Sequence, residues 1–97
     1  SSSAKIYIDQ GASKALKSGK SLLPAGIIKI SGNFKKGDNI VIIDNNNIDI
    51  ARALSSFTSD EINKIKGLQS NQIENILGYA SKSEIVHKDD IVILWKN

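Results

Sequence analysis

The chain has 97 residues, which is enough for one compact domain and too short for two. It contains no cysteine, so disulfides, thiolate metal sites and a thiol nucleophile are excluded, and the composition fits a reducing compartment. The formal net charge is +3, and no stretch has the ~20 consecutive apolar residues of a membrane span or the order of a signal peptide, so we expect a soluble cytoplasmic domain with no membrane partner.

Two short strands and one short helix are predicted near the start of the chain. Lys5–Ile8 alternates polar and apolar residues, as a half-buried strand does, and Asp9 has the position of a helix cap. The helix is expected to end at Gly19 and to dock through its alanines and leucine. Leu23–Gly26 is predicted to form a defined loop, because proline restrains the residue before it and glycine permits an unusual turn. A strand at Ile27–Ser31 should follow.

The middle of the chain is typical of an antiparallel hairpin. Lys35–Asp38 reads as a turn, and Ile40–Ile43 is an apolar run of strand length. Asp44–Asn47 has four residues that favour turns, and Ile48–Leu54 returns as a strand. In that strand, alternation places the two alanines on one face, toward a tight core, and the isoleucines and the arginine on the other.

Two helical segments and a last strand are predicted in the second half. Thr58–Glu61 has the spacing of a capping box, and its helix should end before Gly67. Ser70 begins another short helix, with a cap glycine at Gly78 and an apolar stripe made of Ile73, Ile76 and Leu77. Ile91–Trp95 is a nearly continuous apolar run, which favours a strand buried at the closing edge of a sheet.

No pattern in the sequence predicts catalysis, a metal site or a cofactor site. The triplet Gly19–Ser21 lacks the earlier glycine of a phosphate loop, because Lys14 stands at that position. His87 has no second imidazole or cysteine with which to bind zinc, so a hydrogen bond in the turn before the last strand is the better interpretation. Asp89 and Asp90 are adjacent and do not converge as a catalytic carboxylate pair does, which favours capping or solvation of the turn.

The positive charge is concentrated in the first 36 residues. This segment has seven lysines and one acid, which gives +6 and leaves −3 for the remainder. Lys14 and Lys17 share a face of the first helix and Lys20 follows its end, so three ammonium groups are placed to meet consecutive phosphates. Two simpler explanations stay open: a solvated helix face, and the codon bias of an AT-rich genome, which favours lysine, isoleucine and asparagine over arginine. The five aromatic residues are scattered and form no evident base-stacking platform.

The order of segments carries a family resemblance. The segments are IDQGASKALKSGKSLLPAGI at 8–27, GNFKKGD at 32–38, IARAL at 50–54, IKGLQSNQIENILGY at 65–79 and EIVHKDDIVIL at 84–94. The early glycines and the Pro24 turn resemble PUA domains in general, whereas the later segments resemble the C-terminal PUA domain of the glutamate 5-kinase family. Ala53 and Asn47 stand where that family commonly has glycine, and Lys88 and Asp90 replace a frequent arginine and asparagine. These departures look like tolerated changes of packing and turn.

The resemblance implies a fold, a partner and a division of labour. The fold would be mainly β with short α-helices, a PUA-like pseudobarrel of mixed strands, at residues 4–97, with residues 1–3 as a linker or a remnant of cloning. The partner would be an N-terminal amino acid kinase domain, which phosphorylates L-glutamate with ATP in the first step of proline biosynthesis. ATP and magnesium would bind in that kinase domain, and this chain would hold no catalytic, metal or cofactor site.

Three roles are compatible with the resemblance. The first is a regulatory or assembly module of the parent kinase. The second is binding of structured RNA through the surface that PUA domains generally use, which corresponds here to Gly11, Lys14, Lys17, Lys20, Leu23, Pro24, Ala25 and Gly26, together with part of the last strand. The third is a degenerate domain retained for the stability or solubility of the parent.

Overall fold

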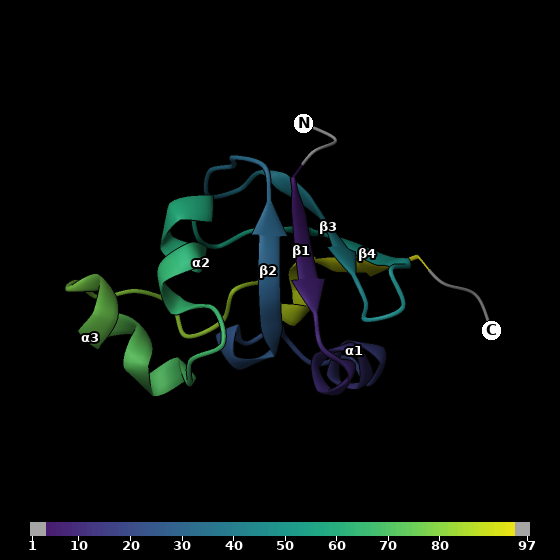
Figure 1. Cartoon of the computed structure of the whole chain (residues 1–97), viewed down its shortest axis with the longest axis horizontal. Coiled ribbons are helices and arrows are strands. Elements are labelled where there is room, and N and C mark those ends of the chain that lie inside the picture. The colour runs from purple at the N-terminus through teal and green to yellow at the C-terminus, as the bar shows by residue number, and fades with distance from the viewer. Residues whose placement is uncertain (1–3, 95–97) are drawn as a thin grey trace.

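A five-stranded mixed sheet organises the molecule (Figure 1). The computed structural model describes residues 4–94, so the serines at 1–3 and Trp95 lie outside the described residues. The strands, in chain order, are β1 (Lys5–Ile8), β2 (Ile27–Ser31), β3 (Asn39–Ile43), β4 (Asp49–Leu54) and β5 (Ile91–Ile93). They are arranged as β2-β1-β3-β4-β5. The strand predictions are therefore confirmed to within a residue or two at their ends.

The sheet is mixed, and a bridge outside its strands brings its two edges toward each other. β1 and β3 are parallel, and the pairs β1/β2, β3/β4 and β4/β5 are antiparallel. Leu22, five residues before β2, forms an isolated antiparallel bridge with Val86, five residues before β5. Because β2 and β5 are the two edges of the sheet, this bridge brings the approaches to both edges together. The mainly β pseudobarrel of mixed strands is confirmed.

Short helices fill the connections. They are α1 (Gln10–Lys17), α2 (Ser59–Ile65) and α3 (Ile73–Leu77), with single 3₁₀ turns η1 (Pro24–Gly26), η2 (Ser70–Gln72) and η3 (Lys88–Asp90). In the expected capping box, the Thr58 side chain accepts a hydrogen bond from Glu61 N, and the Glu61 carboxylate accepts one from Thr58 N. α3 lies at one end of the molecule, beyond α2 and away from the sheet (Figure 1). None of the helices in the described part of the chain is long and apolar enough to cross a membrane.

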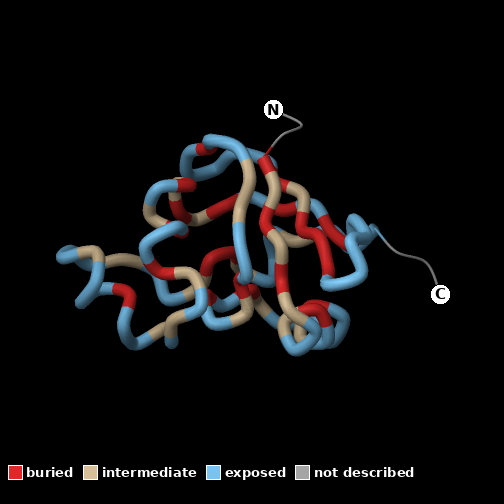
Figure 2. The backbone as a smooth tube through the Cα atoms, in the orientation of Figure 1, coloured by how far each residue is buried: buried red, intermediate tan, exposed pale blue. Residues whose placement is uncertain are grey.

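One hydrophobic core lies inside the curled sheet, and its buried positions follow the central strands and the inner sides of α1 and α2 (Figure 2). Isoleucine dominates it, and Phe57 is the largest fully buried side chain. Ala51 and Ala53 are buried as expected. Ile50 is buried too, against the alternation in the sequence, because the register of β3 and β4 shifts between Ile42 and Ile43 and the resulting bulge turns Ile50 inward.

Two apolar segments are less buried than their sequence predicts. Of the predicted apolar stripe on α3, only Ile73 is buried, whereas Ile76 is 45% exposed. A helix of five residues beside a single neighbouring helix has too little cover for a full stripe. β5 was expected to be buried, yet Val92 is 65% exposed, because β5 pairs with β4 alone at the edge of the sheet.

Candidate binding groove at the first helix

Asp9 fixes the start of α1 and joins it to the Pro24 turn. Its Oδ1 atom accepts a hydrogen bond of 2.8 Å from Ala12 N, which satisfies one of the free amides at the helix start. Its own backbone amide donates to Gly26 O at 2.9 Å. One residue therefore caps the helix and holds the turn against it.

The approach of α1 to the Pro24 turn requires a glycine. A Cβ atom at Gly26 would lie 2.4 Å from the Cβ of Ala12, closer than two carbon atoms can approach. The glycine and the alanine thus allow two backbones to pack directly. This is the physical reason for the small residues on both sides of the groove that opens beside this contact.

The end of α1 is tied to a distant part of the chain. Gly19, with φ of 79°, ends the helix, and Lys20 N donates to Ala15 O at 3.0 Å. Ser21 Oγ then accepts a hydrogen bond of 2.8 Å from Lys88 N, and Ile85 N donates to Leu22 O at 2.8 Å. These contacts place the segment before β5 along one side of the groove.

The groove has a volume of about 470 Å³ and is lined mainly by small and apolar groups. Its lining residues are Asp9, Gly11, Ala12, Ala15, Lys20, Ser21, Leu23, Ala25, Gly26 and Glu84. Leu23 is 46% exposed, so its side chain forms an open apolar wall. A groove of this size is large enough for a short extended segment or a small organic molecule.

Five of the eight residues predicted for RNA binding line this groove, namely Gly11, Lys20, Leu23, Ala25 and Gly26. Lys14 and Lys17 are exposed on α1 but are not among the lining residues, and Pro24 is buried beneath the turn. The structure also places β5 outside the lining. The fold thus gathers the glycines and the loop of the predicted site around Lys20 and leaves the other two lysines beside it.

Sequence reasoning missed the acidic side of the groove. Asp9 was assigned only a capping role, and Glu84 is more than sixty positions from Lys20 in the sequence, so no local pattern connects them. Asp9 and Glu84 are both among the lining residues of the groove, together with Lys20. Because a carboxylate repels a phosphate, this lining offsets the attraction that the lysine alone would give. Within residues 4–94, no cluster of three or more His, Asp or Glu is arranged to hold a metal ion.

The other polar candidates act within local turns. His87 Nδ1 accepts a hydrogen bond of 3.1 Å from Asp89 N and lies 3.5 Å from the Asp89 carboxylate, which confirms the predicted hydrogen bond in the turn before β5. Asp89 and Asp90 lie in the single turn of η3, where the capping residue is His87 and not either aspartate. These residues stabilise the approach to β5.

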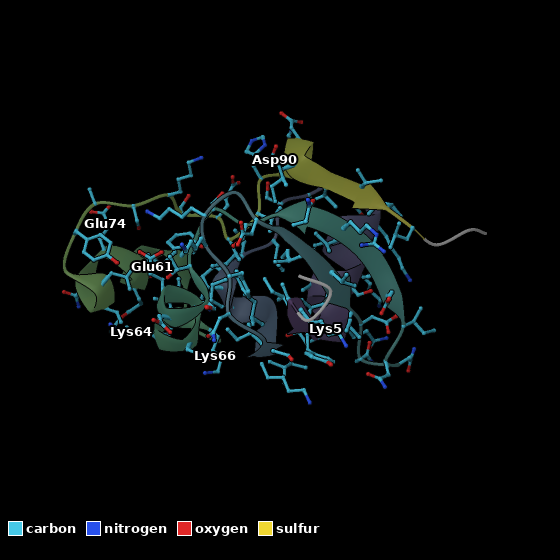
Figure 3. All side chains as sticks on the ribbon, turned by 90° about the horizontal axis from the view of Figure 1, so that it is seen from above. Lys5, Glu61, Lys64, Lys66, Glu74 and Asp90 are labelled. Carbon is cyan, nitrogen blue, oxygen red and sulfur yellow. The ribbon has the colours of Figure 1, made fainter. Side chains whose placement is uncertain are left out.

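A second polar contact ties α2 to the loop after α3. Tyr79 Oη donates a hydrogen bond of 2.5 Å to Glu61 Oε2, while Glu61 Oε1 accepts from Thr58 N at 2.9 Å. Partial burial raises the pKa of Glu61, but the bonds from Tyr79 and Thr58 and the nearby Lys36 ammonium group outweigh it and lower that pKa below its ordinary value. The same hydrogen bond raises the pKa of Tyr79. Glu61 on α2 and Glu74 on α3 lie on the neighbouring helices of this end of the molecule (Figure 3).

Curated relatives are found among glutamate 5-kinases. The chain is 59% identical over 87 residues to the enzyme of Pelagibacter ubique, covering 90% of this chain and 24% of the relative. It is 51% identical over 88 residues to that of Bartonella henselae, covering 91% and 23%. The matched region is the C-terminal part of these proteins, so the chain spans about a quarter of the length of the curated relatives it matches.

Solved structures share the fold at low sequence identity. A PUA domain from Aeropyrum pernix, crystallised as a tartrate complex, has a TM-score of 0.65 and 17% identity, covering 88% of this chain and 41% of that one. A chain of an archaeal box H/ACA sRNP complex has a TM-score of 0.61 and 22% identity, covering 95% and 23%. The family model of the PUA domain matches residues 4–77, which include the whole groove apart from Glu84. The chain therefore belongs to the PUA domain family.

Proposed function

We propose that this chain is the accessory PUA domain of a glutamate 5-kinase and that it serves the parent enzyme in regulation or assembly. The observation that carries the proposal is the high identity over nine-tenths of this chain, confined to about a quarter of each relative. Phosphoryl transfer from ATP to the glutamate side chain, the first step of proline biosynthesis, then belongs to the remaining three quarters. ATP, magnesium and glutamate bind there, in the cytoplasm.

The local hydrogen bonds of this chain support an accessory role. The side chains best suited to acid–base chemistry in the described region already serve the fold: Asp9 caps α1, Glu61 completes a capping box and His87 accepts from the turn of η3. Each is fixed by a contact within three residues along the chain. Such contacts explain their presence without a reaction.

Replacement of a domain in a relative tests the proposal. In Pelagibacter ubique glutamate 5-kinase, the matching segment would be deleted in one variant and replaced by this chain in another. We expect deletion to change the oligomeric state, the kinetics or the inhibition by proline, and we expect replacement to restore what deletion changes. Sedimentation and steady-state kinetics measure both. A deletion variant with unchanged assembly, kinetics and inhibition would refute the accessory role.

RNA binding through the groove is the competing function, and the acids beside Lys20 disfavour it. Titration of labelled bulk tRNA at two salt concentrations separates the two. We expect only weak, salt-sensitive binding, reduced equally by charge reversal of Lys14, Lys17 and Lys20 and by charge reversal of the exposed control set Lys29, Lys35 and Lys36. Micromolar or tighter binding that vanishes only in the first variant would establish the groove as an RNA site.

A further inference from the structure

The side of the sheet that faces away from the core carries an ordered row of side chains. The strand register places Lys5 of β1 beside Val41 of β3, Val41 beside Arg52 of β4, and Arg52 beside Val92 of β5. Neighbouring strands are about 4.8 Å apart, so these four side chains cross the sheet in a nearly straight line. We name this row, with Tyr7 and Lys29 next to it, the outer row. No acidic residue stands at any of its positions.

Arg52 is the central cation of the outer row. It is the single arginine in a chain with twelve lysines. It is exposed, and within residues 4–94 its side chain makes no ion pair or hydrogen bond. A guanidinium group binds a carboxylate through two parallel hydrogen bonds, which a lysine cannot do, and arginine is enriched among residues that dominate protein interfaces. An arginine here therefore presents an unused carboxylate-binding group.

Exposed aliphatic side chains surround Arg52 on the side of β5. Val92 is 65% exposed, Leu54 39% and Leu94 38%. β5 is a strand of three residues at the edge of the sheet, where an apolar surface of this kind marks a site of association. The outer row thus combines cations with exposed apolar side chains.

This composition favours a protein partner over a nucleic acid. The one aromatic ring of the outer row, that of Tyr7, is covered by the Lys29 ammonium group at 4.5 Å from the ring centre. The ammonium group therefore occupies one face of the ring, and valine and leucine offer no stacking surface at all. An apolar patch with arginine at its centre and lysines at its rim is typical of protein interfaces.

We infer that the outer row is the docking face for the kinase part of the parent polypeptide, which meets Arg52 with a carboxylate and Val92 with an apolar surface. This inference rests on the proposed function. About three quarters of each relative lies outside the region matched here. Any segment that precedes Ala4 enters the fold at Lys5, two strands from Arg52 in the same row, so a preceding domain is held next to this face at high effective concentration.

Site-specific photo-crosslinking tests the inference. In the Pelagibacter ubique enzyme with its matching segment replaced by this chain, a benzoylphenylalanine would stand in place of Val92, or, as a control of similar type, in place of the exposed Ile76 on α3. We expect crosslinks into the kinase part from position 92 and not from position 76. Arg52→Glu should lower the yield at least about tenfold and Lys5→Glu less, whereas Lys64→Glu, an exposed charge reversal on α2, should leave it unchanged.

The outcomes separate this inference from the proposed function. Crosslinks from position 76 instead of 92, crosslinks to nucleic acid, or a yield from position 92 that Arg52→Glu leaves unchanged in a folded variant would overturn the docking face. If these results came with full restoration of kinetics by the chain, the accessory role would stand without it. Crosslinks from position 92 that depend on Arg52 in an enzyme with unrestored kinetics would support the docking face and refute the regulatory role.

Discussion

Strands β3 and β5 have similar apolar sequences, but β3 lies inside the sheet and β5 lies at its edge. Both are short apolar runs, Ile40–Ile43 and Ile91–Leu94, each preceded by a polar turn. In β3, Ile40 and Ile42 are at most 1% exposed, whereas in β5 Val92 is 65% exposed. β3 has a strand on each side and β5 has one. An apolar run therefore predicts a strand, and the number of its neighbours decides how much of it is buried.

Truncation of one side chain in each strand should show the difference between the strands most clearly, as unequal losses in the free energy of unfolding. Ile42→Ala removes a fully buried side chain and leaves a cavity, so we expect a loss of about 2–5 kcal/mol in the free energy of unfolding. Val92→Ala shortens an exposed side chain and should cost about 0.5 kcal/mol or less. Chemical denaturation of both variants measures the difference. Equal losses would mean that β5 is covered in the isolated chain and that its exposure is not a property of the fold.

The same distinction explains how much of the molecule was predictable. Local signals were sufficient for the capping role of Asp9, the Thr58–Glu61 capping box and the Gly78 cap, because each depends on residues within a few positions. Two errors, the burial of β5 and of Ile76, concern cover supplied by other elements. Glu84 reaches the groove through long-range contacts such as the Leu22–Val86 bridge, which joins residues sixty-four positions apart and which no local pattern encodes.

The close packing of the buried region continues into the contact between α1 and the Pro24 turn. Gly26→Ala would place its Cβ 2.4 Å from that of Ala12, so the helix must move, and we expect a loss of about 1–3 kcal/mol in stability. Because the clash is with one methyl group, Ala12→Gly should recover part of the loss in the double variant, despite the cost of about 1 kcal/mol for glycine in a helix. A double-mutant cycle by denaturation gives the coupling. Additive losses would contradict a direct Gly26–Ala12 contact.

The inner side of α2 is buried in the core, but Ile76 and Tyr79 at the α3 end are exposed like β5, so polar contacts should carry more of the order there. Thr58→Ala removes the acceptor for Glu61 N at 3.1 Å, and we expect a loss of about 1 kcal/mol. Thr58→Ser keeps the hydroxyl group and should cost less. Hydrogen exchange should show faster opening of α2 in the alanine variant and little change in β3. A uniform change over both would mean that the two regions open together.

The hydrogen bond from Tyr79 to Glu61 gives the smallest effect and a pH signature. Tyr79→Phe keeps the ring and removes the donor, so the variant should be slightly less stable near neutral pH. Because the folded state lowers the pKa of Glu61, its contribution is lost as the pH falls through that lowered value. Because the folded state raises the pKa of Tyr79, its contribution is lost as the pH rises through that raised value, above about 10.

The stability difference between the original chain and Tyr79→Phe should therefore be constant between about pH 6 and 9 and shrink toward both extremes. Thermal unfolding over a pH series measures it. Glu61→Gln can use its one oxygen to accept from Thr58 N, but its NH2 group cannot accept from Tyr79 Oη, so in that background both the acid and the alkaline limb should disappear. If the stability difference between the original chain and Tyr79→Phe did not shrink at low or at high pH, the ring and not the hydrogen bond would hold the loop after α3 on α2. Apolar contacts would then hold that end of the molecule in place, as they do β3, despite its exposure.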